Sequence, residues 1–170
     1  MKKFLSLVSL LLVFLAAGCK DDENVNSKVL STLRFNDKPL MSKTNQYTYT
    51  TSALLDSDGK NYIRGFNIVN KNNPEERFGI AITYPVTKSN ASGSYNFGLG
   101  GANELFAQGT FTLPNNENYV FVGYNVNVND LGNGRYNLSF ADVQAIIPFT
   151  NGNFSIVSGY IETEFTDIQQ

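Results

Sequence analysis

Acidic side chains at two places in the sequence have spacings that could support chemistry. Glu162 and Glu164 lie two residues apart, so on a β-strand their carboxylates would share one face. Two carboxylates that flank a glycosidic bond are the usual catalytic pair of glycoside hydrolases. Because the chain ends a few residues later, we interpret this pair instead as charges that keep an exposed strand edge from pairing with another chain. No catalytic residue is predicted here.

A second cluster consists of Asp56, Asp58 and Asn61, whose oxygens are the type of ligand that calcium prefers. An EF-hand loop beginning at Asp56 would need glycine at its sixth position and glutamate at its twelfth, but Gly59 is at the fourth and Asn67 at the twelfth. A hairpin turn explains these residues better, because aspartate, asparagine and glycine tolerate tight backbone conformations. We therefore expect neither a metal site nor a cofactor.

The side chains that most often perform catalysis at neutral pH are scarce. The sequence contains no histidine and a single cysteine, Cys19. A Ser–Lys pair or a carboxylate pair stays open as a catalytic arrangement. The composition nevertheless favours a protein that is not an enzyme.

The N-terminus is typical of an exported protein. Lys2 and Lys3 precede the apolar run 5–17, and small residues follow up to Cys19. The run is shorter than the roughly 20 residues of a transmembrane helix, so it indicates a removed leader. We expect a signal peptide over residues 1–18, a flexible tether over 19–28 and a folded domain over 29–170.

The sequence LAAGC, ending at Cys19, resembles the lipobox of bacterial lipoproteins, although Ala16 occupies the position where leucine is commonest. The resemblance implies that Cys19 is acylated, becomes the new N-terminus and attaches the protein to a membrane. More than one acyl chain gives stable anchoring. An ordinary secreted protein, whose lone cysteine happens to lie near the cleavage site, is the alternative.

The residues that follow Cys19 carry a second resemblance. Lysine followed by acidic residues is similar to the export signal of Bacteroidota lipoproteins, and here the signal would comprise Lys20, Asp21, Asp22 and Glu23. It implies an outer-membrane lipoprotein on the cell surface. The alternative is a charged tether on a lipoprotein that faces the periplasm.

Size and charge narrow the classes of partner. About 150 residues remain after cleavage, enough for one domain with a real core. The formal net charge is −2, and removal of Lys2 and Lys3 takes away two positive charges to leave −4. Nucleic-acid binding calls for a basic face, so no nucleic acid is expected.

The first half of the domain shows short apolar alternations separated by turn residues, which is typical of β-strands. Residues 47–55 and 62–69 are expected to form a hairpin around the turn at 56–60. Residues 78–84 then place apolar side chains on one face, namely those of Phe78, Ile80, Ile82 and Tyr84.

The second half predicts consecutive hairpins. Residues 105–113 should pair with one long strand over 119–129. One face of that strand is expected to be buried and the other exposed to solvent, because its apolar and polar residues alternate. The expected buried face carries Val120, Val122, Tyr124, Val126 and Val128, and the wet face carries Asn125, Asn127 and Asn129.

The following strand changes phase. Its apolar residues occupy even positions up to Phe140 and odd positions from Val143 onward. A strand with a period of two cannot switch faces, so we predict a bulge or bend near Ala141 and Asp142. The pair at 151–152, Asn-Gly, is a strong hairpin signal and leads into a last strand over 154–165.

Together these patterns predict an all-β fold: a single antiparallel β-sandwich or barrel of about eight to nine strands. The segments FNDKPL (35–40), GSYNF (93–97), AQGTFTL (107–113) and NGNFSI (151–156) resemble small Bacteroidota lipoproteins of uncharacterised function. That resemblance implies a fold type and assigns no activity and no site residues.

The glycine- and serine-rich interval 89–101 is the place where we would expect a binding site. We expect this interval to be a loop crossed by one short strand. Tyr95, Phe97 and Phe106 lie around its glycine-rich residues 98–101, and loops on rigid β scaffolds often carry binding residues. The expected function is that of a non-enzymatic binding or accessory module for a glycan, an apolar small molecule or a protein. A structural or protective envelope lipoprotein without a small-molecule ligand is the alternative.

Overall fold

The computed structural model describes residues 29–41, 43–98, 105–150 and 152–168. These residues form an all-β protein, as predicted, with one short 3₁₀ turn, η1, at Thr44–Gln46. The strands are β1 Leu30–Ser31, β2 Arg34–Phe35, β3 Lys38–Pro39, β4 Tyr47–Leu55, β5 Asn61–Asn70, β6 Arg77–Pro85, β7 Gly93–Phe97, β8 Phe106–Thr112, β9 Asn118–Gly123, β10 Asn125–Gly132, β11 Arg135–Ile146, β12 Ser155–Glu164 and β13 Thr166–Asp167.

The strands belong to one mixed sheet, which differs from the expected number and direction of strands. The sheet has 13 strands in the described part of the chain, and β1, β2, β3 and β13 are only 2 residues long. Two pairs are parallel, β7 with β8 and β13 with β4. The expectation of about eight to nine strands, all antiparallel, was therefore wrong. Two-residue strands have no alternation to reveal them, and parallel pairing depends on tertiary contacts.

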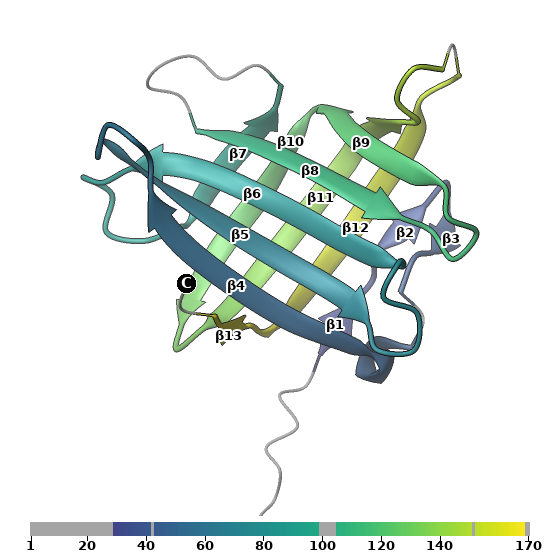
Figure 1. The fold of residues 1–170 in the computed structure, drawn as a ribbon, viewed down its shortest axis with the longest axis horizontal. Helices are drawn as coiled ribbons and strands as arrows, with labels where there is room; N and C mark the ends of the chain where they lie inside the picture. The colour runs from purple at the N-terminus through teal and green to yellow at the C-terminus, as the bar shows by residue number, and fades with distance from the viewer. Residues whose placement is uncertain (1–28, 42, 99–104, 151, 169–170) are drawn as a thin grey trace, which may run out of the picture.

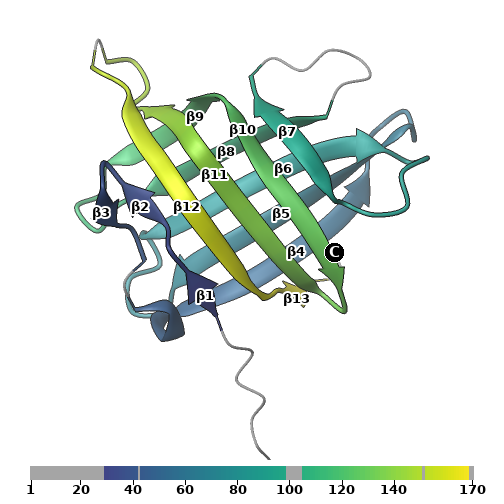
Figure 2. The same ribbon diagram turned by 180° about the vertical axis from the view of Figure 1, so that it is seen from behind.

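The sheet folds into two layers whose strands cross (Figure 1). Strands β4, β5, β6 and β8 form the front layer and lie in front of the back layer, which contains β7, β10, β11 and β12. Figure 2 shows the same layers from behind. At one side the layers are joined by the pairing of β8 with β7 and by β9, which pairs with both β8 and β11. At another, β12 leads directly into β13, which pairs with β4.

The core lies between the layers and is rich in aromatic rings. On β6, Phe78, Ile80, Ile82 and Tyr84 are all buried, as the alternation predicted. The Phe78 ring packs edge-on against Phe121 at 5.5 Å and against Phe140 at 5.6 Å, which joins the two layers.

Two predicted features of the chain path are confirmed. The β4–β5 hairpin pairs Leu55 with Tyr62 across the predicted turn. On β11, Phe140 pairs with Gly159 and Val143 with Val157, so β11 has one residue more than β12 between these pairs. Asp142 adopts a φ of 54° in this bulge, which lets both Phe140 and Val143 face the core.

The expected single strand over 119–129 was wrong. The strand is interrupted at Tyr124, where φ is 65°. The change in backbone direction there separates β9 from β10. Before the break the odd positions Tyr119 and Phe121 are buried, and after it the even positions Val126 and Val128 are buried. Tyr124 itself is 59% exposed. The asparagines of β10 do face water, as expected.

The expected signal peptide and tether, with Cys19 and the charged residues Lys20 to Glu23, lie outside the described residues. Within the described ranges, no helix is long and apolar enough to span a bilayer.

Candidate functional site

The predicted binding aromatics do not form an exposed cluster. Tyr95 and Phe97 are 0% and 1% exposed, because β7 lies inside the sheet between β8 and β10 and turns its odd positions inward. The Tyr95 hydroxyl donates a hydrogen bond to the carbonyl oxygen of Ala91 at 2.6 Å. Phe106 is half-buried at the start of β8. The expectation that Tyr95 and Phe97 are accessible to a ligand was therefore wrong. Most of the glycine-rich segment, residues 99–104, lies outside the described residues.

The carboxylates of β12 do not converge on a cleft. Glu162 accepts hydrogen bonds from Arg135 Nη2 at 2.5 Å and from Asn137 Nδ2 at 3.1 Å, and these contacts hold its pKa below the ordinary value. Glu164 is exposed. Strand β12 pairs with β11 on one side and with β1 and β2 on the other, so the interpretation of a protected free edge was wrong.

The acidic cluster at the β4–β5 turn uses its oxygens within the turn. Asp56 Oδ1 accepts hydrogen bonds from the backbone N–H groups of Lys60 at 2.9 Å and Asn61 at 3.1 Å. Asp56 Oδ2 accepts one from Asn61 Nδ2 at 2.7 Å. This is the predicted hairpin turn. Among the described residues, no group of three His, Cys, Asp or Glu side chains is placed to hold a metal ion.

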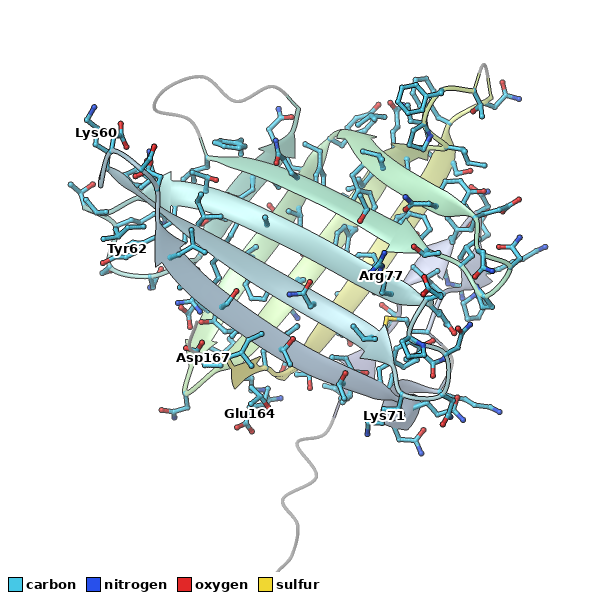
Figure 3. The ribbon with its side chains drawn as sticks, viewed as in Figure 1. Lys60, Tyr62, Lys71, Arg77, Glu164 and Asp167 are labelled. Atoms are coloured by element: carbon cyan, nitrogen blue, oxygen red, sulfur yellow. The ribbon has the colours of Figure 1, made fainter. Side chains whose placement is uncertain are left out.

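A site that the sequence patterns did not single out lies around Arg64. Strand β5 turns its even positions toward the core, where Phe66 and Ile68 are buried, and Arg64 has the same phase. Its side chain therefore enters the space between the two layers. The site faces a cavity of about 330 Å³ at the end of the front layer where Figure 3 labels Tyr62 and Lys60.

Neutral groups from both layers surround the guanidinium. Arg64 Nε donates a long hydrogen bond of 3.5 Å to the hydroxyl of Tyr84, and Nη1 donates one of 3.4 Å to Oγ1 of Thr51. The guanidinium carbon lies 5.6 Å from the centre of the Tyr136 ring, within the range of a cation–π contact. These three partners come from β6, β4 and β11, and all three are buried.

Arg64 has no carboxylate partner in the part of the chain that the structure describes. The ion pairs found there join Lys60 to Asp58 and Arg135 to Glu162. Burial alone would lower the pKa of Arg64, but its hydrogen bond to Tyr84 and the nearby side chains of Tyr136 and Asp167 raise the pKa above its ordinary value. The arginine is thus a permanent positive charge that is half-buried and has unused donors.

Four further polar residues complete the site. Lys88, Ser89 and Asn90 come from the segment that links β6 to β7, and Asp130 comes from β10. Lys88 Nζ donates a hydrogen bond to the carbonyl oxygen of Ser92, and Asp130 Oδ1 accepts one from the Gly132 N–H at 3.0 Å. The cavity therefore presents two cations and one carboxylate.

No protein-family model, curated protein or solved structure matches this chain. The function is therefore inferred from the chain's own residues.

A second cavity lies at the opposite end of β5 and has a volume of about 400 Å³. Glu76 accepts hydrogen bonds there from the Tyr47 hydroxyl and from Asn70 Nδ2, the latter at 2.6 Å. Burial and the contact with Glu76 raise the pKa of Tyr47. Because these groups satisfy one another, they form a structural network that ties the ends of β4 and β5 to the segment before β6.

One signal in the sequence could have identified the Arg64 site. The alternation of β5, Tyr62-x-Arg64-x-Phe66-x-Ile68, places a charged residue in phase with core positions. A charge at such a position needs a partner or a function, because burying an unpaired charge is costly. The pattern does not show which residues of other strands lie around the charge.

Proposed function

We propose that this protein is an outer-membrane lipoprotein, anchored through acyl chains on Cys19 and exposed on the cell surface, that acts as a non-enzymatic binding module. The leader, the lipobox-like sequence and the charged run Lys20 to Glu23 support the location. The domain would then be held outside the cell by a short polar tether.

The pocket around Arg64 is the proposed ligand site, and one observation carries that proposal. Arg64 enters the core with an unpaired positive charge and faces a cavity of about 330 Å³. An arginine that served only to cover the end of the core would gain more from a carboxylate partner than from long contacts to neutral groups. A ligand can supply the missing partner.

The architecture suits such a role. We infer that the two layers form one flattened barrel, because the sheet is continuous from β4 to β12 and the chain returns through β13 to pair with β4. A closed sheet gives a rigid frame for residues at its open ends.

The location is tested by protease shaving of intact cells that produce the protein, beside a Cys19→Ala control. We expect protease to remove the domain from wild-type cells and the control to be released without acyl chains. Mass analysis of the N-terminus establishes whether Cys19 is lipidated. A lipidated domain that resists protease until the outer membrane is opened would contradict surface exposure.

Binding is tested with the mature lipoprotein in detergent micelles and a panel of neutral and acidic oligosaccharides and fatty acids. We expect at least one class to raise the melting temperature of the wild type and of Arg77→Met, but not of Arg64→Met. Arg77 is an exposed arginine at the other end of the front layer (Figure 3). If no compound class distinguishes Arg64→Met from Arg77→Met, the Arg64 pocket is not the ligand site.

A second candidate function is that of an envelope component that contacts another protein and has no small-molecule ligand. The segment between β11 and β12 favours it, because Phe149 is fully exposed and Phe154 is 59% exposed. Exposed aromatic side chains are common anchors of protein interfaces. Phe149→Ser with Phe154→Ser should abolish crosslinking to a neighbouring envelope protein under this alternative and leave crosslinking unchanged under the first proposal.

A further inference from the structure

We propose that the Arg64 pocket binds a carboxylated sugar, meaning a uronic acid alone or at the end of a glycan. This inference rests on the proposed function and specifies the ligand of the same site. Three properties of the pocket lead to it: its charge, its aromatic wall and its hydrogen-bonding groups.

The charge calls for an anion. The guanidinium of Arg64 has donors left over after its long contacts to Tyr84 and Thr51, and a planar guanidinium fits the two oxygens of a carboxylate. Lys88 adds a second positive charge to the lining. Asp130 lines the same cavity and would repel a doubly charged phosphate more strongly than a carboxylate.

The aromatic wall calls for a ring with an apolar face. The rings of Tyr62 and Tyr84 lie 5.7 Å apart at the cavity, and their planes are inclined by 42°. Tyr62 is half-buried, so part of its ring is accessible. The C–H face of a sugar can pack against such a ring, and tyrosine can also form a hydrogen bond.

The other lining groups favour a sugar over a fatty acid. Asn90 and Asp130 can exchange hydrogen bonds with hydroxyl groups. No aliphatic side chain larger than alanine lines this cavity in the described part of the chain, so an acyl tail would find few apolar contacts. A cavity of about 330 Å³ lies near the lower end of the usual range for small ligands, which suits one sugar unit.

The test is a calorimetric titration of the mature lipoprotein in micelles with glucuronate, glucose, dodecanoate and inorganic phosphate as separate probes. We expect glucuronate to bind and the other three probes to bind at least about tenfold more weakly, because each lacks either the carboxylate or the sugar ring. A glucuronate-terminated disaccharide should bind at least as well as the monosaccharide if the natural ligand is a glycan end.

The matched variants locate the binding. Arg64→Met should weaken glucuronate binding about ten- to hundred-fold, which is the usual effect of losing a charged hydrogen bond. Tyr62→Ala should weaken it by a smaller factor, and Arg77→Met should leave it unchanged. Circular dichroism of each variant shows whether the fold is intact. For Arg64→Met, retention of the wild-type fold is required, and Arg64→Lys gives a second test that keeps the charge but loses the planar donors.

The outcomes separate the ligand class from the binding function. Glucose binding as tightly as glucuronate, or Arg64→Met binding glucuronate like the wild type, would overturn the carboxylated-sugar proposal. Dodecanoate or phosphate that binds as tightly as glucuronate, with binding that Arg64→Met abolishes, would also overturn it, while the Arg64 pocket would stand as a binding site. If none of the probes binds, the proposal fails, and the panel described under the proposed function decides whether the pocket binds any ligand.

Discussion

The guanidinium of Arg64 on β5 lies over the ring of Tyr136 on β11, with 5.6 Å between the guanidinium carbon and the ring centre. Strands β5 and β11 lie in different layers of the sheet (Figure 1), so the contact crosses the interior. It holds the arginine in place beside the cavity while leaving donors free. This relationship places a positive charge at that end of the core.

Replacing Arg64 with methionine should change the free energy of unfolding by less than about 1 kcal/mol. The variant loses a cation–π contact of about that size but also removes an unpaired, half-buried charge. Urea denaturation measures the difference, with Phe66→Ala as the comparison. Phe66 is buried on the same strand, and its truncation should cost about 3–5 kcal/mol. A loss of similar size for Arg64→Met would mean that Arg64 mainly stabilises the fold.

Gly159 should be among the positions of β12 least tolerant of alanine. Its φ is 94°, and an added Cβ would collide with the backbone carbonyl of Thr32. Gly159→Ala should therefore destabilise the protein by about 3 kcal/mol, since it combines backbone strain with a clash. Gly132→Ala is the control, because φ there is 80° but nothing lies near the added atom. It should cost about 1 kcal/mol. Equal losses in the free energy of unfolding for the two variants would contradict the prediction, because the clash with Thr32 would then have no energetic effect.

Alkaline pH should unfold the protein through its tyrosines. The pKa values of Tyr47, Tyr49 and Tyr95 are raised, mainly by burial. In the unfolded chain these phenols ionise near pH 10. Their contribution to stability is therefore complete below about pH 10 and is lost as the pH rises toward the folded-state values.

Tyrosinate absorbance and circular dichroism, followed together during an alkaline titration, measure this effect. Part of the tyrosinate signal should appear only when the β-structure is lost. Tyr124→Phe serves as a control, because Tyr124 is exposed and its substitution leaves the buried tyrosines in place. Ionisation of all tyrosines near pH 10 with an intact fold would contradict the prediction.

Local alternation predicted those parts of the fold in which neighbouring strands follow directly in sequence. The β4–β5 hairpin and the bulge at Asp142 could both be predicted, because turn residues and a change of phase are visible in the chain itself. The break at Tyr124 could not, because the alternation continues through it and only a positive φ reverses the faces. The glycine-rich interval around Tyr95 indicated a loop crossed by one short strand, but it did not show that β10, from a later part of the chain, pairs with that strand.

The candidate site was harder to predict than the fold. Arg64 could have been flagged from its phase on β5, but Tyr84, Tyr136 and Asp130 meet it only because two layers cross at this end. Spacing along the chain does not show which residues of different strands lie together in the fold. The carboxylate pair at Glu162 and Glu164 had a suggestive spacing, but the structure gives it a different role: Glu162 bonds to Arg135 on the neighbouring strand.

A crystal structure of the mature protein grown with glucuronate tests the central claim most directly. We predict that the carboxylate of the sugar lies within hydrogen-bonding distance of the Arg64 guanidinium, with the sugar ring against Tyr62. Crystals of the Arg64→Met variant, grown in the same way, should contain no sugar at that position. Glucuronate bound elsewhere, or absent while the Arg64 cavity is open to solvent, would contradict the account.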